Sequence, residues 1–78
     1  MINSNTAFQI SEQHGSTFKV SKGSYVVEIS QWNDGRWFGS YDPGKGSSKV
    51  GSAGVRDREA IIQWAKRVIN QAILERSK

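Results

Sequence analysis

The sequence predicts an α+β fold, with an antiparallel β-meander of three to four strands and one C-terminal amphipathic helix packed on one face. Segments in which apolar and polar residues alternate, typical of half-buried strands, recur between residues 8 and 41. Asp34-Gly35 lies between two such segments and is a strong hairpin signal, because both residues tolerate positive φ. Residues 57–75 carry apolar side chains at three- and four-residue spacing, as expected for a helix.

The N-terminal part of the chain has weaker signals. Residues 1–6 are polar, and we expect a frayed end. Phe8 and Ile10 alternate with polar residues, and residues 17–20 alternate again after a turn at residues 11–16. These two segments are compatible with one irregular hairpin, but the pattern leaves open whether it joins the main sheet.

Residues 24–32 form the clearest expected strand, and residues 36–41 are its hairpin partner. If Asp34-Gly35 is a two-residue loop, Trp32 lies directly opposite Trp37. A three-residue loop would change the parity of the second strand and bury one of the two tryptophans.

The two-residue loop has consequences for the faces of the sheet. Phe38 then shares the core face with Val27 and Ile29, because successive side chains of a strand alternate between faces. The opposite, outer face is expected to carry Glu28, Ser30, Trp32, Trp37, Gly39 and Tyr41.

The C-terminal half combines a loop and the helix. Residues 42–54 are rich in glycine and serine and are expected to form a flexible loop, with a weak strand at 49–53. The helix is expected over 57–75, with Leu74 on its polar side. Its apolar stripe consists of Ile61, Trp64, Ala65, Val68, Ile69, Ala72 and Ile73.

Composition bounds the possible functions. The 78 residues suit one small domain, and the absence of cysteine excludes disulfides and thiolate metal sites. The net charge is +4, with −1 in residues 1–35 and +5 in residues 36–78. A basic half suggests an anionic partner, although solubility alone explains such a charge. No segment is long enough to span a membrane and residues 1–6 do not resemble a signal peptide, so we expect a cytoplasmic protein.

Catalytic motifs are incomplete. Gly39–Lys45 matches the start of a phosphate-binding P-loop, but Gly46 replaces the required serine or threonine and no helix is expected to follow. His14 is the single histidine and lies in a polar stretch, which favours a structural role. We therefore expect no enzyme, no cofactor, no metal and no small-molecule substrate.

The expected outer face and the basic residues near it form the candidate binding site. Bases stack on aromatic rings, although a cross-strand tryptophan pair can equally serve to stabilise a hairpin. Arginine at a helix start opposes the helix dipole, which suggests binding, although the stem of Arg58 could instead pack along the sheet. The candidate residues are Glu28, Trp32, Arg36, Trp37, Tyr41, Lys45, Lys49, Arg56 and Arg58.

The segments Tyr25–Ser30, Asp34–Tyr41 and Glu59–Trp64 resemble the AP2 domain and the related arm-binding domains of phage and transposon integrases. The resemblance implies a three-stranded sheet whose outer face enters the DNA major groove, with a helix behind it. Glu28 and Trp37 match positions that contact DNA in that family.

The chain also departs from the family. Ser30 and Gly35 stand where the family has base-reading arginines, and the link at residues 42–54 is longer than usual.

Two functions follow as hypotheses. The first is a nucleic-acid-binding module, with DNA as the ligand that the resemblance implies. The second is a small protein of the type encoded by phages and mobile elements, which would bind and inhibit or modulate a host protein through the same aromatics. A homodimer formed through an open sheet edge is a third alternative.

Overall fold

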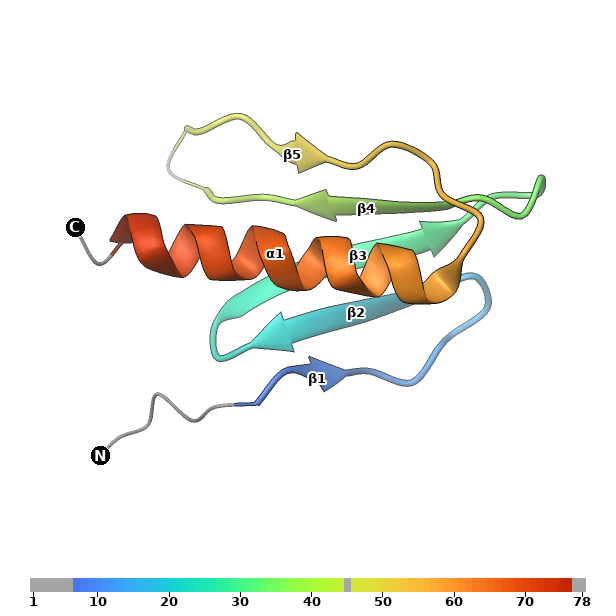
Figure 1. The fold of residues 1–78 in the computed structure, drawn as a ribbon, viewed down its shortest axis with the longest axis horizontal. Coiled ribbons are helices and arrows are strands. Elements are labelled where there is room, and N and C mark those ends of the chain that lie inside the picture. Colours follow the sequence, from blue (N-terminus) through green and yellow to red (C-terminus); the bar gives the residue numbers. More distant parts are fainter. Residues whose placement is uncertain (1–6, 45, 77–78) are drawn as a thin grey trace.

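The computed structural model describes residues 7–44 and 46–76, and within them an α+β fold. A five-stranded antiparallel sheet has its strands side by side in chain order, and one helix crosses one face of it (Figure 1). The elements are β1 (Gln9–Ile10), β2 (Thr17–Lys22), β3 (Tyr25–Gln31), β4 (Trp37–Tyr41), β5 (Val50–Gly51) and α1 (Arg58–Arg76). The expected fold class is confirmed, with five strands instead of three to four.

The N-terminal hairpin joins the sheet. Ile10 pairs with Val20 and Gln9 with Ser21, so the irregular hairpin considered from the sequence is present as β1–β2. β2 then pairs with β3 along its whole length, from Thr17 opposite Ser30 to the turn at residues 23–24. The strands β1 and β5 have two residues each, and β5 lies within the weak strand expected at residues 49–53.

The β3–β4 connection differs from the expected two-residue loop. Gln31 pairs with Trp37, and the Trp32 N–H donates to the Arg36 carbonyl at 2.8 Å, so three residues form the loop. The Gly35 N–H donates to the Trp32 carbonyl at 2.9 Å, and Gly35 has a φ of 89°. This is a turn closed by a left-handed glycine, a common three-residue hairpin connection.

The extra loop residue exchanges the two faces of β4. Since side chains alternate along a strand, a shift of one residue sends each of them to the other side of the sheet. Trp37 and Tyr41 lie in the core, 5% and 9% exposed, on the same face as Val27 and Ile29. Phe38 lies on the opposite face, so its expected place in the core was wrong, as was the expected exposure of Trp37, Gly39 and Tyr41.

Helix α1 starts one residue later than expected, because Asp57 caps it. The Asp57 carboxylate accepts a hydrogen bond from the Glu59 N–H at 3.3 Å, which satisfies a donor of the first turn. The helix buries Ile61, Ile62, Ala65 and Ile69 against the sheet, and Trp64, Val68, Ala72 and Ile73 are partly buried. Ile62 was missing from the expected stripe.

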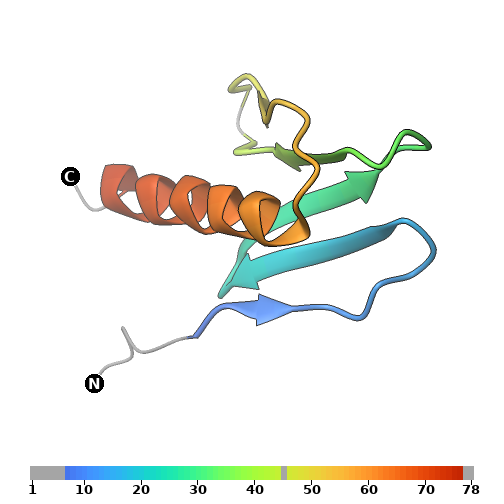
Figure 2. The same ribbon diagram turned by 45° about the vertical axis from the view of Figure 1, so that its right-hand side comes forward.

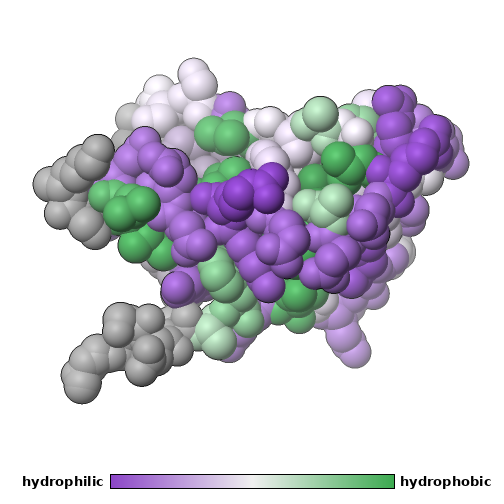
Figure 3. Space-filling view, viewed as in Figure 1, coloured by the Kyte–Doolittle hydropathy of each residue, from purple (hydrophilic) through white to green (hydrophobic). Residues whose placement is uncertain are grey.

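The helix covers one face of the sheet, and the other face has no second layer in the described part of the chain (Figures 1 and 2). Hydrophilic residues cover most of the side of the molecule on which α1 lies (Figure 3). Leu74, which is 60% exposed near the end of α1, fits its expected place on the polar side. No helix among the described residues has the length and apolar character needed to cross a membrane.

Close packing between α1 and β4 depends on Gly39. The indole of Trp64 lies directly on this glycine, and a Cβ at position 39 would be 2.8 Å from Cε3 of the ring and nearer still to Cζ3. Because real Cβ atoms do not approach other carbons so closely, a side chain at position 39 would push the helix away from β4.

Gly39→Ala is expected to lower the free energy of unfolding by about 1–3 kcal/mol, the usual cost of inserting a methyl group into a filled core. Gly51→Ala is the matched control, because its Cβ would meet no atom nearer than 3.9 Å. Urea denaturation followed by circular dichroism measures both variants. Equal stability of the two would contradict the tight contact with Trp64.

Candidate binding surface on the open sheet face

The face of the sheet opposite α1 is called the open face here. The pairing registers place one set of side chains on it, since directly paired residues share a face. The set consists of Thr17, Lys19, Ser21, Val26, Glu28, Ser30, Phe38 and Ser40. Trp32 and Arg36 extend it at the start and end of the β3–β4 loop. Its members are mostly small or polar, with two aromatic rings at the loop end.

The two rings, Trp32 and Phe38, form a tilted pair in contact. Their centroids are 4.6 Å apart and their planes are tilted by 39°. Trp32 remains 58% exposed, whereas Phe38 is half-buried beneath it. The expected tryptophan–tryptophan pair is therefore replaced by Trp32 with Phe38, the residue next to Trp37.

Gly54 provides the space beneath Phe38. The segment after β5 runs beside β4, because the Val55 N–H donates to the Trp37 carbonyl at 3.0 Å and the Ser52 N–H to the Gly39 carbonyl at 3.0 Å. A Cβ at position 54 would lie 2.7 Å from the Cζ atom of Phe38. The ring of Phe38 is thus held between the backbone of this segment and the indole of Trp32.

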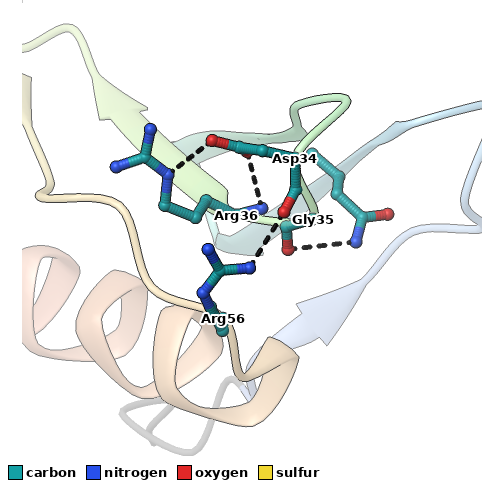
Figure 4. Close-up of polar contacts among 5 residues, drawn as sticks. Asp34, Gly35, Arg36 and Arg56 are labelled. Atoms are coloured by element: carbon teal, nitrogen blue, oxygen red, sulfur yellow. Dashed lines mark hydrogen bonds and ion pairs between the residues drawn. The ribbon is translucent and has the colours of Figure 1, made fainter.

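Two arginines bond the β3–β4 loop (Figure 4). Arg36 donates from Nε to the Asp34 carboxylate at 2.8 Å, and its guanidinium carbon lies 5.6 Å from the Phe38 ring centroid. Arg56 donates from Nη1 to the Asp34 carbonyl at 2.9 Å, and the Gln31 amide donates to the Gly35 carbonyl at 3.3 Å. These bonds hold the loop to the neighbouring segments and place Arg36 beside the aromatic pair.

Asp34 remains ionised beside these cations. The Arg36 backbone N–H, 3.1 Å from Oδ1, and then the Arg36 guanidinium hold the pKa of this carboxyl below its ordinary value of 3.8. The side chain of Asp34 therefore carries a negative charge at the tip of the hairpin at neutral pH.

The other candidate residues are dispersed. The Arg58 guanidinium lies 4.3 Å above the Phe18 ring on the helix side of the sheet, where Phe18 meets Trp37 edge to face. Arg58 therefore packs over the core, in agreement with the alternative that its stem lies along the sheet. Lys49 is exposed just before β5, and Lys45 lies outside the described residues.

Burial removes Trp37 and Tyr41 from the candidate site. Desolvation raises the pKa of the Tyr41 hydroxyl above its ordinary value, in keeping with its place beside the core. Glu28 and Trp37, which the AP2 resemblance implies as DNA contacts on one face, lie on opposite faces of the sheet.

The structure thus brings Glu28, Trp32 and Arg36 together on the open face with Lys19 and Phe38, which sequence reasoning missed. The signal that could have found Phe38 was the three-residue loop, which was considered as an alternative.

Comparison of the chain with protein-family models, curated proteins and solved structures gives no match.

Trp37→Ala is expected to lower the free energy of unfolding by about 3–5 kcal/mol, because it empties a large volume of the core. Trp32→Ala removes an exposed ring and is expected to cost less than about 1 kcal/mol. Urea denaturation of the two variants makes the comparison. A Trp32→Ala loss as large as that of Trp37→Ala would contradict the loop register.

The Asp34 carboxyl is expected to titrate with a midpoint below 3.8 in a pH series of NMR spectra, and Arg36→Gln should raise that midpoint only part of the way. The residual shift is expected because the backbone N–H of residue 36 remains a donor. Since the pKa is lowered in the folded state, this contact stabilises the fold above pH 3.8, and its contribution is lost as pH falls through the folded pKa. An unshifted midpoint in the unsubstituted protein would contradict the contact.

Proposed function

We propose that this protein is a non-catalytic nucleic-acid-binding module whose contact surface is the open face. The observation that carries the proposal is the exposed Trp32 indole, stacked on Phe38 beside the Arg36 guanidinium on the side of the sheet without a helix. This combination offers a ring for bases and a cation for phosphate at one place.

Stacking of a base on the aromatic pair would contribute favourable free energy to binding. Base–aromatic stacking contributes about 1–3 kcal/mol per base. Phe38 is already packed against the segment at Gly54, and Trp32 rests on Phe38, so little side-chain freedom remains to be lost on binding. The Trp32 side chain is therefore held in place before any ligand binds.

The charge distribution supports an anionic ligand. The chain has a net charge of +4. Among residues 7–44 and 46–76 the structure has one ion pair, between Arg36 and Asp34, so most basic side chains of this part lack a carboxylate partner. Uncompensated lysine and arginine attract phosphate and release condensed counterions when they bind it.

Binding and modulation of a host protein is the second candidate, and the carboxylates on the surface favour it. Glu28 on the open face and Asp34 at the hairpin tip give the surface both signs of charge. Exposed tryptophan and arginine are also the residues that dominate protein–protein contacts. Mixed charge of this kind suits a protein surface as well as an oligonucleotide.

Fluorescence anisotropy of labelled oligonucleotides in a salt series tests the proposal. We expect affinity that falls steeply as salt rises, and a loss of about 5- to 150-fold for Trp32→Ala, equivalent to the stacking of one base. Leu74→Ala is the matched control, since it removes another exposed apolar side chain from the far side of the molecule. It should bind like the unsubstituted protein.

Two outcomes would overturn nucleic-acid binding at this surface. The first is the absence of binding to DNA and RNA at low salt, which would direct attention to the protein partner. The second is binding that Trp32→Ala and Leu74→Ala change equally, which would place the ligand elsewhere on the molecule.

A further inference from the structure

We propose that the open face selects single-stranded nucleic acid over duplex, with an unpaired base stacked on Trp32 and its phosphate at Arg36. This inference rests on the proposed nucleic-acid function and specifies the form of ligand that the surface accepts. Three features of the open face carry it: the accessible ring, the free part of the Arg36 guanidinium and the position of two carboxylates.

The first feature is the ring. Phe38 occupies one side of the Trp32 indole, at a centroid distance of 4.6 Å, and the 58% exposure of Trp32 leaves the rest to solvent. A base that stacks there continues the Trp32–Phe38 stack. In a duplex the faces of each base are already covered by neighbouring bases, so this contact is open to unpaired bases and strand ends.

The second feature is the guanidinium of Arg36. Its Nε is engaged by Asp34 at 2.8 Å, whereas the structure gives its two Nη groups no partner among the described residues. Two parallel N–H donors of arginine can hold a phosphate in a forked arrangement. Arg36 is also close to the aromatic pair, 5.6 Å from the Phe38 centroid, so one nucleotide can reach ring and cation together.

The third feature is the pair of carboxylates. Glu28 is exposed in the middle of the open face, between Lys19 on β2 and Ser40 on β4, and Asp34 lies at the hairpin tip. A duplex laid on the sheet brings two phosphate backbones, and these carboxylates repel them. A single strand brings one backbone, which can follow the arginines while its base edges face the carboxylates. Glutamate and aspartate accept hydrogen bonds from exocyclic amino groups such as cytosine N4.

The loop geometry joins the three features. Asp34 bonds Arg36 through its carboxylate and Arg56 through its carbonyl, so the acidic tip and both arginines keep a fixed arrangement around the loop (Figure 4), and Arg36 also lies beside the Phe38 ring. Base stacking and phosphate binding are thus proposed at one hairpin end, with Asp34 at its tip and Glu28 further along the open face.

The test compares single-stranded and duplex oligonucleotides of the same sequence, about twelve nucleotides long, which is within the range of sites on comparable single-strand-binding sheets. DNA and RNA are each run as such a pair at low salt. We expect at least ten-fold tighter binding of the single strand, with quenching of tryptophan fluorescence on binding. Trp32→Phe should keep most of the affinity and lose most of the quenching, because Trp37 is buried and Trp64 is packed on Gly39.

Two further variants test the carboxylate and the support of the ring pair. Glu28→Gln should narrow the preference by strengthening duplex binding more than single-strand binding, since it removes a charge, keeps a hydrogen-bond acceptor and leaves the Asp34–Arg36 bond in place. Gly54→Ala should displace Phe38 and press on Arg36, whose Cδ would lie 3.2 Å from the new Cβ, and so weaken single-strand binding without touching Trp32 directly. Gly51→Ala, whose Cβ meets no close atom, is its control.

The outcomes separate the two proposals. Duplex binding as tight as single-strand binding, still weakened by Trp32→Ala, would overturn the single-strand preference and leave nucleic-acid binding at this surface intact. Absence of binding to both forms would overturn both proposals. Tight single-strand binding that Trp32→Ala does not weaken would show that the nucleic acid binds elsewhere than at Trp32 on the open face, and would overturn both proposals for this surface.

Discussion

The three-residue loop between β3 and β4 determines which side chains of β4 enter the core. Gly35, at a φ of 89°, closes the turn by donating to the Trp32 carbonyl, and this fixes Gln31 opposite Trp37. With that register, Trp37 and Tyr41 meet α1, and Phe38 points to the other side. Two further bonds, from Arg56 and Gln31 to carbonyls of the loop, hold the turn in place. Both the packing of the helix and the content of the open face depend on this turn.

The same register explains why two glycines lie where they do. Gly39 faces the helix and leaves room for the Trp64 indole, whereas Gly54 faces the open side and leaves room for Phe38. Each large ring therefore lies against backbone at a glycine, and Phe38 also contacts the Trp32 ring. A sheet of this size has few buried positions, and the Trp64 ring fills the space between helix and sheet by approaching the backbone closely.

Much of the fold could be predicted because it depends on periodicity. The long strands β2, β3 and β4 and the helix α1 all show their repeats in the sequence, and Asp57 gave the helix start to within one residue. The strands β1 and β5 fall within segments that the sequence indicated weakly, the alternation at Phe8 and Ile10 and the weak strand at residues 49–53, but each has two residues and is held by pairing with a neighbour. The pattern therefore left open whether the N-terminal segment joins the sheet.

The candidate site was only half predictable, because Asp34-Gly35 is compatible with two loop lengths. Both possible faces of β4 contain aromatic residues, so hydrophobicity did not choose between Trp37 with Tyr41 and Phe38. Glu28 and Trp32 belong to the strand before the loop, and their place on the outer face was unaffected by its length. Every residue after the loop inherited the error, which is why Trp37 and Tyr41 were misplaced and Phe38 was missed.

Because the single helix covers only one face of the sheet, the side chains of the open face are not part of the core. Ile29 and Val27 lie fully buried beneath α1, while Glu28 and Ser30 alternate with them on the side that no other element covers. Substitutions on the open face therefore alter charge and stacking with little effect on packing. An indole left 58% exposed there contributes little to folding, yet it is ordered by Phe38 and flanked by arginine. A ring that is ordered without being buried contributes little to stability, and this is the reason for proposing the hairpin end as the binding site.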